Sequence, residues 1–412
     1  MERVLIHNIG ELVTPIGRKA RHGPAMNQVS ILRKAAIYIE NGCIMEVGDS
    51  EQLLRKYHQS TQQIDAAMRC AIPGFIDPHT HFLFAGQRAG EFVSRLEGVP
   101  YLKLLEQGGG ICQTMKATRL ASSEELLQQG RDIVHKMLHL GVTTMEGKSG
   151  YGLDRETELR QLQVMKELNE ETPMTIKRTF LGAHAVPPEF KGRSSDYVEF
   201  LLAEMLPLIR QEKLADFCDV FCETGVFSLA ESERLLRGGQ AIGLKAKIHA
   251  DEINSTGGAG LAAQLGAISA DHLLSIAPQD IVALASSNTV AVLLPATAFC
   301  MRKPFAPARE MIRQGCAVAL ASDFNPGSCY TYSIPLILGL AVISMKMTLA
   351  EALTALTLNA AAAIDESERL GSIEPGKQAD ILLLADYDVN SLVYQTGINQ
   401  VEHVIKNGRM LW

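Results

Sequence analysis

From about residue 80 onward, short apolar runs alternate with longer amphipathic segments. The amphipathic segments, such as 123–141, 155–171 and 229–243, repeat their apolar residues at the spacing of one face of an α-helix. The runs between them are short and rich in β-branched and other apolar residues, which is typical of buried strands. This alternation predicts repeated βα units around a parallel sheet.

Eight such runs follow one another along the chain, each ahead of a helix-like segment. They occupy 72–81, 142–152, 175–188, 217–227, 244–252, 267–274, 289–298 and 318–327. Eight βα units close a barrel, and α/β barrels commonly take about 250 residues or more. We therefore expect residues 71–370 to form an α/β fold, a (β/α)8 TIM barrel.

The two ends of the chain show a different pattern. Residues 1–70 and 371–412 are rich in short strands separated by turns, as at 35–49 and 376–388. Neither end has the composition of a linker. We expect the two ends to pair in a small composite β-sandwich domain, with the barrel inserted between them.

Composition narrows the class of protein. With 412 residues, 47% hydrophobic and 21% charged, the chain is typical of a globular protein rather than a disordered or fibrous one. A formal net charge of -7 argues against a nucleic-acid partner, because phosphates need a basic surface. The first residues lack a signal-peptide core, and no run of about 18 apolar residues occurs, so we expect a cytoplasmic protein without a membrane anchor.

The eight cysteines form no CxxC pair and no regular framework, so we expect reduced thiols. Two of them, Cys218 and Cys222, lie in a strand-like run and are best explained as small core residues.

Candidate chemistry lies where the predicted strands end, because the reactive groups of such barrels sit at the carboxyl ends of the strands. The first predicted strand ends in His79-Thr80-His81, and the i, i+2 spacing points both imidazoles to the same side. His249 and Asp323 end later strands. Three neutral nitrogens and one carboxylate suit a single metal ion that keeps a position open for water.

Each of these residues also has an ordinary structural explanation. A lone histidine is usually hydrogen-bonded in the core, and an aspartate at a strand end often caps the next helix. However, four of the eleven histidines, His79, His81, His249 and His272, fall at predicted strand ends, which chance placement would seldom give. Together with Asp323, they favour a metal-dependent hydrolase.

Several longer motifs carry a resemblance that covers nearly the whole chain. The chain resembles the amidohydrolase superfamily and, within it, the imidazolonepropionase family. The resemblance rests on PGFIDPHTH at 73–81, QGGGI at 107–111, KSGYG at 148–152, FLGAHAVPPE at 180–189, KIHADEI at 247–253, SADHL at 269–273 and SDFNPGS at 322–328.

That resemblance implies hydrolysis of the cyclic amide of 4-imidazolone-5-propanoate to N-formimino-L-glutamate, in histidine catabolism, with one zinc or iron ion per chain. It assigns the metal to His79, His81, His249 and Asp323. It assigns the substrate to Arg88, Tyr151, His184, Glu252, Asn325, Gly327 and Ser328.

The substrate residues make physical sense, because a guanidinium such as Arg88 binds a carboxylate in bidentate fashion and the substrate carries a propanoate. Tyr101 or Tyr151 would add a hydroxyl donor. As catalytic residues we expect Glu252 to shuttle the proton, His272 to polarise the carbonyl or bind the oxyanion, and Asp323 to assist in deprotonating water.

Some relatives hold a second ion with a carbamylated lysine or a glutamate, so Lys148 and Glu223 could be mistaken for ligands of a second ion. The fourth predicted strand offers no lysine, and we expect Glu223 to orient a neighbouring group. A homodimer is the default expectation for the assembly.

Two other functions fit part of the pattern. A cyclic deaminase acting on a nucleobase-like ring would use the same histidines and aspartate, but KSGYG and Arg88 favour ring opening. A catalytically silent assembly protein with this barrel would not need the complete ligand set and Glu252. The choice between zinc and iron stays open, since three histidines and an aspartate suit either.

Overall fold

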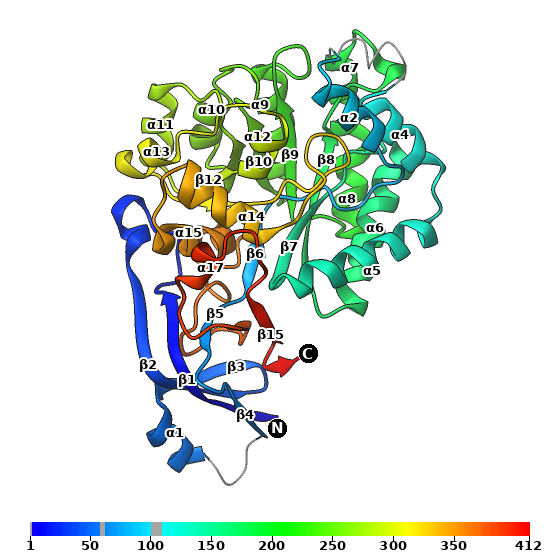
Figure 1. The fold of residues 1–412 in the computed structure, drawn as a ribbon. Coiled ribbons are helices and arrows are strands. Elements are labelled where there is room, and N and C mark those ends of the chain that lie inside the picture. The colour runs from blue at the N-terminus through cyan, green and yellow to red at the C-terminus, as the bar shows by residue number, and fades with distance from the viewer. Residues whose placement is uncertain (1, 58–61, 100–108) are drawn as a thin grey trace.

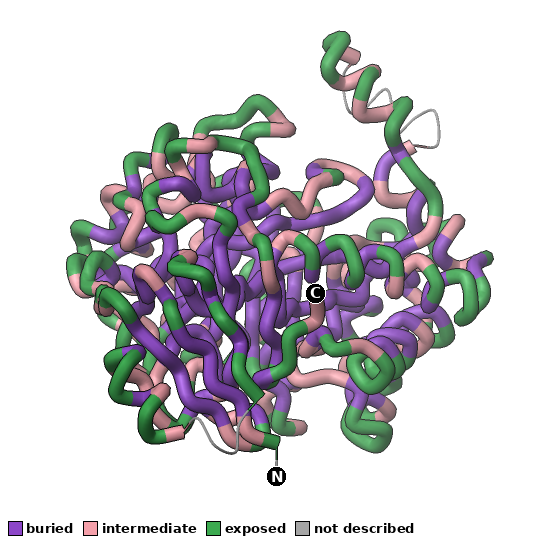
Figure 2. Tube along the Cα trace, turned by 60° about the horizontal axis from the view of Figure 1, so that its bottom comes forward, coloured by how far each residue is buried: buried purple, intermediate pink, exposed green. Residues whose placement is uncertain are grey.

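The computed structural model describes residues 2–57, 62–99 and 109–412. Figure 1 shows two parts: a barrel of strands surrounded by helices, and a sheet that contains both termini. In Figure 2 buried residues fill the interior of the molecule, and exposed residues gather on its outer segments. No helix in the described ranges is long and apolar enough to cross a membrane.

The barrel consists of eight strands in sequence order, each parallel to its neighbours. It is closed by a parallel bridge between Thr80 and Phe324, where His81 N donates to Phe324 O at 2.9 Å. All eight predicted strands are confirmed. They are β6 (Phe75–Asp77), β7 (Val142–Lys148), β8 (Thr175–Ala183), β9 (Phe217–Cys222), β10 (Lys245–Ala250), β11 (Ser269–His272), β12 (Val290–Leu293) and β13 (Val318–Leu320).

Helices cover the outside of the barrel, and their first turns explain where they begin. Helix α6 spans the predicted segment, Arg155–Glu171, because the Asp154 side chain accepts a hydrogen bond from Thr157 N. Capping boxes start α5 (Ser123–His139), α9 (Leu229–Ala241) and α15 (Leu349–Leu356). The other principal barrel helices are α7 (Ser194–Phe200), α8 (Leu206–Glu212), α10 (Gly258–Leu265), α11 (Pro278–Ala285), α13 (Ala308–Gln314), α14 (Ile334–Gly339) and α16 (Leu358–Ala363).

The termini build one mixed sheet, separate from the barrel, to which both ends of the chain contribute strands. Strand β5 joins them, because it pairs in parallel with β1 and antiparallel with β14. The strands are β1 (Arg3–Pro15), β2 (Val29–Glu40), β3 (Cys43–Asp49), β4 (Gln62–Asp65), β5 (Cys70–Pro73), β14 (Ile381–Leu384), β15 (Val401–Lys406) and β16 (Arg409–Met410).

This terminal sheet curls around its own core. Ile44 N of β3 donates to Lys377 O at 2.8 Å, although β3 and the strand after Lys377 lie toward opposite ends of the sheet. Side chains from both ends, including Ile44 and Ile405, meet in one buried apolar cluster. The sheet therefore encloses a core between its two halves, as a sandwich does.

Gly74 separates the two parts of the molecule. The first predicted strand, 72–81, began too early, because Ile72 and Pro73 belong to β5 of the terminal sheet. A Cβ at Gly74 would lie 2.4 Å from Thr143 Oγ1, so only glycine allows the chain to pass this close to β7 on its way to β6.

Candidate metal centre

The His79-Thr80-His81 segment continues β6 into the mouth of the barrel. All three residues are buried, and Thr80 turns away from the histidines to donate to Glu146 O at 2.7 Å. Before them, Asp77 accepts from Ser322 N at 3.1 Å and so ties the first strand to the last. Burial raises the pKa of Asp77 to about 7. The i, i+2 expectation for the two imidazoles is met.

Four candidate ligands converge here. His79 Nε2 lies 3.3 Å from His81 Nε2, and His81 Nε2 lies 3.4 Å from His249 Nε2. Asp323 Oδ1 lies 3.5 Å from the Nε2 atoms of both His79 and His81. An ion with bonds of about 2.0–2.1 Å in tetrahedral geometry separates its ligand atoms by about 3.3–3.4 Å. The ligand atoms of His79, His81 and Asp323 therefore fit a single ion, and His249 Nε2 adjoins this group through His81.

Asp323 has a backbone suited to this position. Its φ of 51° lies in the left-handed region, which aspartate adopts more readily than most residues. Thr297 Oγ1 donates to Asp323 Oδ2 at 2.7 Å, which leaves Oδ1 facing the histidines. Burial raises the pKa of Asp323 to about 6.

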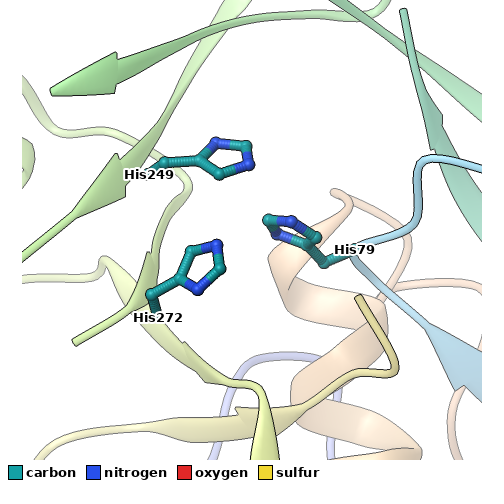
Figure 3. Close-up of side chains that lie close together, drawn as sticks. All are labelled: His79, His249 and His272. Carbon is teal, nitrogen blue, oxygen red and sulfur yellow. The ribbon is translucent and has the colours of Figure 1, made fainter. Parts of the chain in front are cut away.

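Figure 3 shows that His272 points to the same place as His79 and His249, from the end of β11. One ligand atom from each of these three histidines lies within 4.8 Å of the others. His272 Nδ1 also lies 3.7 Å from Glu252 Oε1. His272 is thus within reach of both the metal centre and the partly buried carboxyl group of Glu252.

Carboxylates hold the outer nitrogens of two ligands. Asp271 Oδ2 lies 2.7 Å from His79 Nδ1, and Asp219 Oδ2 lies 3.0 Å from His249 Nδ1. Such contacts fix the orientation of a metal-binding imidazole. Burial lowers the pKa of His79, which keeps the ring neutral as a ligand requires. Burial also opposes charge on His249, but the Asp219 carboxylate raises the pKa of that ring overall.

Asp219 and Asp271 were not predicted from the sequence as partners of the ligands. A signal was present, because Asp219 interrupts an apolar run in β9 while its neighbours Cys218 and Cys222 belong to the hydrophobic core. An acidic residue within such a strand indicates a buried polar partner. Both cysteines are core residues, as expected.

The predicted substrate residues His184 and Tyr151 lie beside His81. The His184 ring stacks on His81 with centroids 4.9 Å apart, and its Nδ1 atom lies 3.0 Å from Gly150 O. Tyr151 is buried, with its ring 5.3 Å from His184 and 5.8 Å from His81. Burial lowers the pKa of His184 to about 3, so this ring is neutral.

Arg88 is buried and paired with Glu91, a residue that sequence analysis did not select. Arg88 Nε donates to Glu91 Oε2 at 3.0 Å, and Arg88 Nη2 donates to Glu91 Oε1. A Cβ at Gly327 would lie 2.5 Å from Arg88 Nη1, so the predicted anion-binding residue is packed against the loop after β13. The i, i+3 spacing in α2 (Ala89–Leu96) was the available signal for Glu91.

Asn325 organises that loop. Its Oδ1 atom accepts from Gly327 N at 2.8 Å and from Ser328 N at 2.7 Å, while its Nδ2 atom donates to Asp323 O at 2.7 Å. The loop therefore connects the candidate ligand Asp323 to the neighbourhood of Arg88.

Glu252 and Glu223 have separate roles in the structure. Burial raises the pKa of Glu252 to about 8, with a further contribution from the Asp323 charge. Glu223 Oε2 accepts from Ile253 N at 2.9 Å and from Asn254 N at 3.2 Å, so it holds the loop that carries Glu252. Tyr101 and part of the glycine run at 107–111 lie outside the described residues.

Known proteins resemble the chain over nearly its full length. An amidohydrolase family model matches residues 101–411. The imidazolonepropionase of Parabacteroides distasonis is 51% identical over 99% of this chain and 98% of that protein. The imidazolonepropionase of Clostridium tetani is 48% identical over 99% of this chain and 98% of that protein. The chain belongs to the imidazolonepropionase family of amidohydrolases.

Solved structures support the fold of this imidazolonepropionase family member. Guanine deaminase of E. coli has a TM-score of 0.73 at 14% identity, over 100% of this chain and 99% of that chain. A triazine hydrolase from Arthrobacter aurescens has a TM-score of 0.74 at 17% identity, over 100% and 95% of the two chains. These likenesses confirm the amidohydrolase fold. Amidohydrolases typically depend on a metal, and the convergent donor set described above fits one.

Proposed function

We propose that this protein hydrolyses 4-imidazolone-5-propanoate to N-formimino-L-glutamate, a step of histidine catabolism. The observation that carries the proposal is a set of convergent ligand atoms at the mouth of the barrel, in a member of the imidazolonepropionase family that also buries the Arg88 guanidinium. Arg88 would supply a charge for the propanoate, and Tyr151 and His184 would supply rings beside the planar imidazolone.

The resident cofactor in this proposal is one zinc or iron ion, held by His79, His81, His249 and Asp323. When bound, such an ion lowers the pKa of water toward 7 and polarises a carbonyl oxygen. Histidine nitrogens and a carboxylate suit either metal.

The chain's own residues would move the protons. Glu252, when ionised, accepts a proton from the water that attacks the ring carbonyl carbon, and Asp323 assists in this deprotonation. The bond between that carbon and the adjacent ring nitrogen then breaks, and Glu252 returns the proton to the nitrogen. His272 lies 3.7 Å from Glu252 and is neutral because burial lowers its pKa, so it can donate an N–H to the oxyanion.

Substrate positioning would fall to the residues around His81. Arg88 binds the propanoate through the guanidinium edge not taken by Glu91, and Tyr151 and His184 flank the ring. Asn325, Gly327 and Ser328 shape the loop opposite, and Tyr101 is proposed as a further donor.

The decisive experiment is a turnover assay on 4-imidazolone-5-propanoate with chelator-treated protein and with protein reconstituted with zinc or ferrous ion. We expect turnover to vanish on depletion and to return at one ion per chain, with N-formimino-L-glutamate as the product. Full turnover without metal would refute the metal-dependent mechanism. Ammonia release from a nucleobase ring, without imidazolone turnover, would favour the deaminase alternative.

We also propose a cytoplasmic homodimer. Support comes only from the sequence and from the usual symmetry of such enzymes. Light scattering coupled to size-exclusion chromatography would test the dimer, because a monomer mass near 45 kDa would refute it.

A further inference from the structure

Beneath the candidate ligands lies a buried lysine that the proposed mechanism does not use. Lys148, at the end of β7, is fully buried. Its Nζ atom lies 2.8 Å from Glu146 Oε1, 2.8 Å from Asp219 Oδ2 and 3.5 Å from Asp271 Oδ2. A lysine is almost never buried without a partner, and here one ammonium faces three carboxylates.

Two of these carboxylates, Glu146 and Asp271, form a site with His79 that suits a cation. Ligand atoms of His79, Glu146 and Asp271 lie within 4.8 Å of one another, a spacing that would hold a metal ion. Carboxylate oxygens are the donors that Mg²⁺ and Mn²⁺ prefer. Lys148 Nζ contacts two of the three members of this group, Glu146 and Asp271. Its positive charge therefore stands where a second divalent ion would bind.

Two of the carboxylates also reach the metal ligands. Asp219 lies between Lys148 and His249, and its Oδ2 atom is within 3.0 Å of both partner nitrogens. Asp271 Oδ2 lies 3.5 Å from Lys148 Nζ and 2.7 Å from His79 Nδ1. Through these two carboxylates, the ammonium is connected to the outer nitrogens of two ligands.

We propose that the Lys148 ammonium acts as a built-in substitute for a second metal ion. It limits the centre to one ion and positions Asp219 and Asp271 against the ligand histidines. This inference rests on the proposed one-metal function. It also makes Lys148 a poor carbamate former, because carbamylation needs the neutral amine and would add a negative charge beside three carboxylates.

A neighbouring lysine provides a matched control. Lys247 is equally buried, but its Nζ atom donates to Ala363 O at 3.0 Å and Pro78 O at 3.3 Å. Its nearest carboxylate oxygen, Glu146 Oε2, lies 3.6 Å away. Removing the Lys247 charge should therefore leave the metal stoichiometry at one.

The test compares Lys148→Ala, Lys148→Met and Lys247→Met, each prepared in Mn²⁺ and in Zn²⁺. Metal content is measured by mass spectrometry, and paired Mn²⁺ ions are detected by electron paramagnetic resonance. We expect one ion in the wild type, one in Lys247→Met, and two coupled ions in Lys148→Ala, where a cation refills the vacated space. In Lys148→Met the side chain fills that space without charge, so we expect one ion bound about 10- to 100-fold more weakly.

One ion of wild-type affinity in both Lys148 variants would overturn the proposal. A Lys148→Ala chain that stays unfolded at every Mn²⁺ concentration would overturn it too, because the second ion should restore the thermal midpoint. A wild type without any bound ion would instead refute the proposed function. The two failures are therefore distinguishable.

Discussion

Two regions of this molecule bury ammonium groups, and they do so in opposite ways. In the terminal sheet, Lys377 donates to three backbone carbonyls, those of Gly17, Ser367 and Leu370, and burial lowers its pKa to about 8. Under the barrel mouth, burial also opposes the charge of Lys148, but the surrounding carboxylates raise its pKa above the ordinary value. The same residue type is shifted in opposite directions by its partners.

The two regions also differ in how fully their buried polar groups are hydrogen-bonded. In the terminal domain, Lys406 pairs one-to-one with Asp380 at 2.6 Å and also donates to Thr175 Oγ1 at 2.9 Å. In the barrel mouth, the buried atoms His81 Nδ1, His272 Nδ1 and Asp271 Oδ1 have no hydrogen-bond partner within the described residues. Satisfied polar groups hold a fold together, whereas unsatisfied ones indicate a ligand or a catalytic role. The described part of the terminal domain also contains such atoms, His7 Nδ1 among them, but those in the barrel mouth lie beside candidate metal ligands, where a bound ion or substrate would satisfy them.

The largest effect should follow from removing a ligand. His79→Ala should lose the ion, and turnover should fall by more than the ~10²–10⁴-fold typical of acid or base loss. The thermal midpoint of the metal-free protein should change little by comparison. Metal analysis and kcat measure the two effects. A variant that retains one ion per chain would show that the ligand set is wrong.

Glu252→Gln should separate activity from stability within the barrel mouth. We expect retained metal, unchanged or higher stability, and about 10²-fold or greater loss of kcat, because the amide cannot accept the proton that the carboxylate accepts. The wild-type rate should rise with pH as Glu252 ionises. Burial raises the pKa of Glu252 to about 8 and a bound cation opposes that shift, so this limb should lie between about 4.3 and about 8. A pH profile that keeps the limb in Glu252→Gln would exclude the proton-shuttle role.

In the terminal sheet we expect a substitution to reduce stability and to leave activity unchanged. Lys406→Met leaves Asp380 buried without its partner, which typically costs about 3–5 kcal/mol of folding stability. Metal content and KM of the folded fraction should stay at wild-type values. Denaturant unfolding monitors the loss. Stability equal to that of the wild type would contradict the structural role assigned to this pair.

Arg88 is the intermediate case, because it lies in the barrel mouth but has a satisfied partner in Glu91. Arg88→Met should raise KM for the propanoate substrate by about 10- to 100-fold, the usual value of a hydrogen bond to a charged group. Metal content should not change. Gly327→Ala is the matched variant, since its methyl group would displace the Arg88 guanidinium and should raise KM in the same direction. Unaltered KM in both would remove Arg88 from the anion site.

Much of this molecule could be predicted from local pattern. The eight barrel strands and the start of α6 follow from apolar spacing and a capping aspartate, both of which act within a few residues. The candidate ligands could be grouped because all parallel strands end at one mouth. The strand at 72–81 was assigned too many residues, because the break at Gly74 depends on contact with Thr143, which no local pattern shows.

The network below the ligands could not be predicted in this way. Lys148, Asp219 and Asp271 come from three strands and meet only after the barrel has closed. Their types were visible in the sequence, but the side of the strand that each occupies depends on register. The pairing of Arg88 with Glu91 could be predicted from their i, i+3 spacing. The position of the Arg88 guanidinium, however, also depends on its packing against Gly327, which the spacing does not show.

The first and last barrel strands meet at the candidate metal site, and this affects when the site can form during synthesis. The strands close where Asp323 N donates to His79 O at 3.0 Å, so the first and last barrel segments supply backbone contacts and candidate ligands together. During synthesis, His79 and His81 leave the ribosome long before Asp323 does. A nascent chain that has not yet exposed Asp323 can offer only part of the candidate coordination sphere, so the complete donor set forms only after the last barrel strand has been made.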